Sequence, residues 1–302
     1  MTKKMLVDDH IRRNKRNTIV VCAVMALLFI GIVYAIGFIL FPGQPLIPLI
    51  FAIPIALVYV GITYSFSVQS VLSAAKARPA NPQNREEKLL IHRVEEMSIA
   101  SGLPMPKIYV QDSEYINAFA TGKKPEQSVV CVTTGALRKL NQEELTGVIA
   151  HELSHIKNYD IRIATITIGV VGAISILSEI LFYSLIFGGG RGRGRNNGNA
   201  IFIVIAILFA ILAPLFARLT YLAISRKREY LADSSGAYMS RNPEGLAKAL
   251  EKIKQDAPTT KPQGSKTVAP LYISNPFKSN SANSVWSTHP PINERIKRLR
   301  SM

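Results

Sequence analysis

Long runs without charged residues alternate along the chain with segments of mixed polarity. Thr18 to Phe41 reads TIVVCAVMALLFIGIVYAIGFILF, and Leu46 to Phe66 forms a second uncharged run. Two later runs, 163–187 and 200–224, contain one charged residue each. A helix of about 20 apolar residues matches the hydrocarbon thickness of a bilayer. The pattern therefore predicts four transmembrane helices, over 18–41, 46–66, 163–187 and 200–224.

The alternative interpretation of these runs is a set of buried core helices. It is weak for the first two, because an uncharged run of this length rarely suits the core of a soluble protein. The first run is also too long for the core of a signal peptide and lacks a clear small-residue cleavage site. We therefore expect it to be retained.

The segments between the apolar runs predict a small α+β domain. Arg85 to Ala100 places apolar residues near helical spacing, and Gly102 suits the end of that helix. Short β-like runs follow at 107–111, 115–121 and 128–134. Together they predict a small sheet that follows one helix.

Two further helices and a loop are predicted in the polar segments. Asn141 can cap a helix over 142–158, with a glutamate three residues on as its reciprocal partner. An Asn-Pro pair begins another helix, over 244–254. Residues 256–284 are rich in Ser, Pro, Asn and Lys, which predicts a mobile loop.

The charge pattern orients the predicted spans. The net charge is +16, and hydrophobic residues make up 48% of the chain. Basic residues flank the spans instead of forming a nucleic-acid surface, and Lys and Arg accumulate on the cytoplasmic side of membranes. We expect a basic cytoplasmic N-terminus over 1–17, a transmembrane hairpin over 18–66, a cytoplasmic catalytic part over 67–160, a second hairpin over 161–224 and a second catalytic part over 225–302.

One connection conflicts with this orientation. GGGRGRGRNNGN, from Gly188 to Asn199, joins the third and fourth spans and would place three arginines outside. Either this hairpin is a weak exception, or it does not cross fully. The two cysteines, Cys22 and Cys131, give no disulfide framework, which is typical of a reducing compartment.

The candidate chemistry lies in HELSH, residues 151–155. His151 and His155 are four residues apart, so they lie on one face of a helix and can bind a single zinc ion. Glu152 lies beside them and can take a proton from zinc-activated water and pass it to a leaving amine. The alternative is an ordinary polar helix face, and the predicted capped helix favours the metal site.

Catalytic zinc needs a third protein ligand and an open fourth position. Glu229, in SRKREYLADSSGAY, is the candidate, and Asp233 could hold the free nitrogen of His151 or His155. Alone, this segment is more typical of an acidic pair on a solvated helix. Beside HELSH we expect Glu229 to bind the metal.

Two further segments supply candidate supporting residues. NAFA ends a β-like run, and a sheet edge can pair with a substrate backbone, so we expect Asn117 and Ala118 to bind substrate. Alternatively this is an interior strand whose Phe119 packs in the core. His289, in THPP, could donate to a developing oxyanion or could cap the last helix.

These motifs together resemble the HtpX family of membrane zinc metallopeptidases, relatives of the CAAX prenyl proteases. VIAHELSHIKNYD, REYLAD, STHPP and NAFATG occur in the family's order, and the likeness covers nearly the whole chain. The resemblance implies a zincin-like domain with one zinc on His151, His155 and Glu229, and Glu152 as catalytic acid and base. It also implies a cytoplasmic-facing site in the cell membrane and a role in membrane-protein quality control under stress.

The sequence leaves three functions to weigh. The first is an integral-membrane zinc endopeptidase that hydrolyses misfolded or damaged membrane proteins, with the lipid bilayer and other membrane proteases as partners and no nucleic acid. The second, an intramembrane protease, conflicts with the polar ends of the 142–158 helix. The third is a non-catalytic membrane chaperone or scaffold that retains a metal site.

Overall fold

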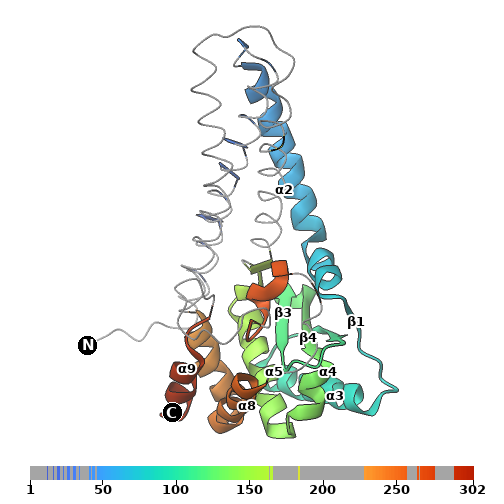
Figure 1. Cartoon of the computed structure of the whole chain (residues 1–302), viewed down its shortest axis with the longest axis vertical. Coiled ribbons are helices and arrows are strands. Elements are labelled where there is room, and N and C mark those ends of the chain that lie inside the picture. The colour runs from blue at the N-terminus through green and yellow to red at the C-terminus, as the bar shows by residue number, and fades with distance from the viewer. Residues whose placement is uncertain are drawn as a thin grey trace, which may run out of the picture. The chain divides into compact units, whose positions relative to one another are not determined.

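The computed structural model divides the chain into two compact units. Unit 1 consists of residues 1–16, 68–165 and 222–302, and unit 2 of residues 17–67 and 166–221. The structure describes residues 46–162, 164–165, 228–256, 264, 266–275 and 289–302, with residue 183 and scattered positions between 12 and 44. All elements named below are drawn in Figure 1.

Unit 1 contains a four-stranded mixed sheet in the order β1-β2-β4-β3. The strands are β1 (Ala77–Pro79), β2 (Lys107–Gln111), β3 (Ala118–Gly122) and β4 (Ser128–Thr133). β2 and β4 are parallel, whereas β1 and β3 pair antiparallel with their neighbours. β3 is therefore an edge strand, with β4 on one side only.

The helix α5 (Gln142–Lys157) lies at the centre of unit 1. It packs against α3 (Arg85–Ser101), α8 (Pro243–Gln255) and β3, and α8 packs against α9 (Ile292–Leu299). The predicted capping box is confirmed, since Asn141 and Glu144 exchange side-chain to backbone hydrogen bonds. Most of α5 is buried, which fixes the direction in which its histidines point.

Three elements of unit 1 were not expected from the sequence. β1 falls between the second apolar run and the 85–100 helix, where no strand was predicted, and the short helix α4 (Thr134–Lys139) begins where a strand was expected to end. The 3₁₀ helix η2 (Lys266–Leu271) lies within the predicted mobile loop. That prediction is wrong for residues 268–273, because Val268, Ala269, Tyr272 and Ile273 are buried.

The helix α2 (Leu46–Ala75) covers the second apolar run and continues into unit 1. In the part of the chain that the structure describes, no helix meets the length and hydropathy needed to cross a membrane. The spans predicted over 18–41, 163–187 and 200–224, and the hairpin 188–199, lie outside the described residues apart from isolated positions. The four spans stay a prediction.

Candidate metal centre

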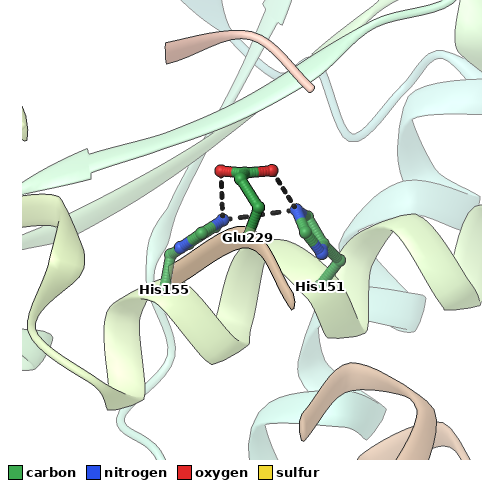
Figure 2. A group of neighbouring side chains, drawn as sticks. All are labelled: His151, His155 and Glu229. Carbon is green, nitrogen blue, oxygen red and sulfur yellow. Dashed lines mark hydrogen bonds and ion pairs between the residues drawn. The ribbon is translucent and has the colours of Figure 1, made fainter. Parts of the chain in front are cut away.

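Three side chains from two distant segments converge in unit 1. His151 and His155 project from one face of α5 toward the carboxylate of Glu229, which belongs to a helix described over 228–240 (Figure 2). The two Nε2 atoms are 3.2 Å apart. Glu229 Oε2 lies 3.8 Å from His151 Nε2, and Glu229 Oε1 lies 3.6 Å from His155 Nε2.

These distances and atoms fit a zinc site. Tetrahedral zinc with bonds of about 2.0–2.1 Å separates its ligand atoms by roughly 3.3–3.4 Å. The distance between the two Nε2 atoms is close to that value, each Glu229 oxygen lies somewhat farther from one Nε2 atom, and two imidazoles with one carboxylate are a known catalytic zinc set. His151 and Glu229 are almost fully buried, so the donor atoms are already desolvated.

A carboxylate contacts the outer nitrogen of each histidine. His151 Nδ1 lies 3.1 Å from Asp233 Oδ1, and His155 Nδ1 lies 3.0 Å from Asp160 Oδ2. These contacts favour a proton on Nδ1, which leaves the Nε2 lone pair free for a metal. The prediction for Asp233 allowed either histidine, and the structure places it on His151.

Arg295 and His289 surround the carboxylate of Glu229. The guanidinium of Arg295 is fully buried, with Nη1 3.3 Å from Glu229 Oε2 and Nη2 2.7 Å from Asp233 Oδ1. His289 Nδ1 lies 3.1 Å from Glu229 Oε2. Although burial raises it, the pKa of Glu229 is held well below its usual value by His289 and Arg295. Glu229 therefore stays an anion.

The remaining pKa shifts follow the same balance of burial and charge. Burial raises the pKa of Asp233, but Arg295 and His151 lower it to about 2. Burial lowers the pKa of His155, but Asp160 and Glu229 raise it to about 9. For His151 burial prevails, and the pKa falls below its usual value. The two histidines thus differ because Asp160, Glu229 and Glu152 outweigh the burial of His155, whereas Asp233 does not outweigh the burial of His151.

Glu152 is buried beside the histidine pair. Burial raises the pKa of its carboxyl group to about 7, with a further increase from Glu229, while His155 opposes the shift. The backbone N–H of Ala120, on β3, contacts this carboxylate. A group that titrates near neutral pH can both accept and return a proton, as hydrolysis requires.

The sequence is similar to known peptidases along nearly all its length. Residues 84–302 match Peptidase family M48. A Protease HtpX homolog from Streptococcus uberis is 42% identical, over 98% of this chain and 100% of the relative. The homolog from Dictyoglomus turgidum is 44% identical, over 97% of this chain and 94% of its own.

The chain belongs to peptidase family M48.

A comparison with solved structures also found the crystal structure of S. mikatae Ste24p. The two share 20% identity and a TM-score of 0.49, over 92% of this chain and 62% of that one. The family resemblance drawn from the HELSH, REYLAD and THPP motifs is confirmed by the M48 match and by relatives named Protease HtpX homolog.

In this M48 chain the predicted substrate residues are in contact with the chain itself. Asn117 is 3% exposed, and its side-chain nitrogen donates to Ser274 O at 2.6 Å. Ala118 O accepts a hydrogen bond from Ile273 N at 3.1 Å. Their role in substrate binding stays a prediction. Phe119 is buried against the ring of Tyr272, as the alternative interpretation expected.

Two residues of the M48 site were not predicted, Asp160 and Arg295. Asp160 follows His155 by five residues, just beyond the end of α5, where helical spacing gives no reason to pair them. Arg295 sits in the basic segment NERIKRLR, where nothing local distinguishes it from its neighbours. His289 does not cap α9, whose first turn has no side-chain cap.

Proposed function

We propose that the chain is a zinc-dependent endopeptidase with one zinc ion on His151, His155 and Glu229. The observation that carries the proposal is the convergence of these three donor atoms, together with a carboxylate behind each imidazole. When bound there, zinc supplies Lewis acidity, which acidifies water and polarises a peptide carbonyl.

The surrounding residues supply proton transfer and positioning. Glu152 accepts a proton from the attacking water and returns it to the leaving amine, which its pKa near neutrality suits. Asp233 and Asp160 hold the imidazoles in the required tautomer. Ala118 and Asn117, at the edge strand β3, bind the backbone of an extended substrate by strand addition.

The proposed setting is the cytoplasmic face of the cell membrane. The four apolar runs and their basic flanks support it. Large apolar side chains are exposed along the first part of α2, among them Leu46, Ile50, Phe51 and Leu57. An apolar surface of this kind is typical of contact with lipid or another protein. Misfolded or damaged membrane proteins are the proposed substrates, in a quality-control role beside other membrane proteases.

Replacing Glu152 by Gln tests the hydrolytic function. We expect zinc to stay bound while cleavage of an unfolded membrane protein falls by at least about 100-fold, the usual contribution of a general acid-base group. The measurement is metal content together with proteolysis of the full-length protein in detergent. Undiminished cleavage by a zinc-loaded Glu152→Gln protein would contradict the proposal. A wild-type protein that binds zinc and cleaves nothing would favour the scaffold function.

His289 is the proposed donor to the oxyanion. It lies within the site, with Nδ1 3.1 Å from Glu229 Oε2, and its side chain is 11% exposed. Replacing His289 by Ala should lower kcat by about 100-fold, the cost of one oxyanion donor, without loss of zinc. Steady-state kinetics on a fluorogenic peptide, with metal analysis of the same sample, provide the measurement. An unchanged kcat would remove His289 from the catalytic residues.

A further inference from the structure

A segment of the chain lies along the free edge of β3. Ile273 N donates to Ala118 O at 3.1 Å, and Ser274 N approaches Asn117 Oδ1 at 3.4 Å. In return, Asn117 Nδ2 donates to Ser274 O at 2.6 Å. The contacts run from 273 to 274 on one side and from 118 to 117 on the other. One backbone hydrogen bond and two bonds to the Asn117 side chain therefore hold residues 273–274, which form a bend, beside the start of β3.

The segment is held by its side chains as well as its backbone. Tyr272 and Ile273 are 1% and 2% exposed. The Tyr272 ring packs edge-on against Phe119 with 5.4 Å between centroids, and its hydroxyl donates to Gln111 Oε1 at 2.9 Å. Ile273 belongs to the hydrophobic core cluster. The site thus accommodates a buried aromatic and a buried β-branched side chain in succession.

The guanidinium of Arg295 contacts both this segment and the metal centre. Arg295 Nη1 lies 3.4 Å from Ile273 O, within donor reach, and 3.3 Å from Glu229 Oε2. Two residues along β3 from Ala118, the N–H of Ala120 contacts the carboxylate of Glu152. The backbone of residue 273 is therefore adjacent to groups that touch the metal ligand and the proposed base.

We propose that Tyr272–Ser274 is an internal pseudosubstrate, which occupies the position of an extended substrate and must leave before a substrate can bind. The proposal rests on the proposed function, which gives Asn117 and Ala118 to the substrate backbone. The Ala118 carbonyl and the Asn117 side-chain amide that hold the segment cannot bond to a substrate at the same time, so the segment and a substrate compete. Only molecules in which the segment is displaced can bind substrate. The apparent affinity for substrate is therefore proportional to the fraction of such molecules.

This occupancy restrains proteolysis without a separate inhibitor. It also assigns a substrate class: an extended, unfolded chain with a large apolar residue where Ile273 lies. The competing interpretation is that residues 272–274 are a permanent part of the sheet that supports β3. The two interpretations predict different effects on proteolytic activity. Loosening a pseudosubstrate raises the activity, whereas loosening a structural strand lowers it or leaves it unchanged.

Replacing Ile273 by Asp places a charge in the apolar pocket and weakens the segment's hold. In full-length, zinc-loaded protein in detergent, we expect kcat/KM for labelled β-casein to rise about fivefold, through a lower KM at constant kcat. The matched control is Ile99→Asp, the same change at a side chain that is 77% exposed, which should leave kcat/KM unchanged. Unchanged or reduced cleavage by an Ile273→Asp protein with wild-type zinc content would overturn the proposal.

A synthetic peptide keeps the test independent of how that variant folds. APLYISN, which copies residues 269–275, should inhibit β-casein cleavage by the wild-type protein competitively. A second peptide, N-methylated at the isoleucine, lacks the N–H that pairs with Ala118 O and should not inhibit. Equal inhibition by both peptides, or by neither, would overturn the pseudosubstrate. Absence of any Glu152-dependent cleavage would instead overturn the proposed function, and the pseudosubstrate with it.

Discussion

At the scale of single residues, Arg295 offsets the negative charge of the metal centre. Its guanidinium is fully buried and makes two hydrogen bonds to Asp233, at 2.9 and 2.7 Å, besides its contact with Glu229. Two carboxylates without this cation would be buried as uncompensated charges, which is costly. A neutral side chain at 295 therefore removes the main stabilising partner of Asp233 and, beside His289, one of the partners of Glu229.

Replacing Arg295 by Leu should destabilise the protein by about 3–5 kcal/mol, the usual cost of breaking a buried charge pair. The matched control is Arg298→Leu, three residues along the same helix. Arg298 is exposed and stacks on the Tyr230 ring at 3.8 Å, so its loss should cost about 0.5–1 kcal/mol. Denaturant unfolding of both variants, in detergent and without metal, is the measurement. Equal losses of unfolding free energy in the two variants would show that the buried ion pairs of Arg295 stabilise the protein no more than the exposed contact of Arg298 does.

At the scale of elements, the metal site depends on how closely two helices approach. A Cβ on Gly236 would lie 3.0 Å from His151 N and 3.1 Å from His151 Cα, so the glycine permits contact between the backbones. Gly236 is seven residues after Glu229, two turns along the same face of that helix. A movement of the 228–240 helix at this contact would therefore also move the carboxylate of Glu229.

Replacing Gly236 by Ala should push the 228–240 helix away from α5 by a few tenths of an ångström. We expect zinc affinity to fall by roughly 10-fold, since positioning groups around a metal ligand typically matter by that much. Competition with a chromophoric chelator measures it. The control is Gly61→Ala in α2, where an added Cβ meets nothing within 4 Å. If both variants hold zinc as tightly as wild type, the close approach at Gly236 does not tune the site.

The same scale explains which elements the sequence could predict. The α5 helix was predictable to within a residue, because its cap and its apolar spacing are local features. β3 was predicted to begin three residues too early, since Tyr115 and Ile116 have strand propensity but precede the paired residues. β1 was missed because three residues, ARP, carry no strand pattern and form a strand only through pairing with β2.

At the scale of the whole molecule, the site joins parts of the chain that are far apart in sequence. His151 and His155 come from 67–160, and Glu229, His289 and Arg295 from 225–302, the two segments that were expected to form the catalytic parts. The motifs predicted His151, His155 and Glu229 as metal ligands because each motif carries its own chemistry, and the structure brings these three side chains together. Arg295, Asp160 and the Ile273 contact depend on tertiary packing alone, and no spacing rule in the sequence connects them to HELSH.

Metal removal should therefore loosen unit 1 as a whole. A ligand that binds only the folded state stabilises it by about 3–4 kcal/mol at 100–1,000 times its dissociation constant. For a domain of this size, that predicts a melting temperature roughly 5–15 °C higher with saturating zinc than with a chelator. Thermal unfolding of the Glu152→Gln protein, which avoids self-digestion, is the measurement. In a Glu229→Gln variant the shift should shrink sharply, because one of three ligands is weakened. An unchanged melting temperature of the Glu152→Gln protein in chelator would show that zinc does not join residues 67–160 to residues 225–302, and that packing of the hydrophobic core holds them together.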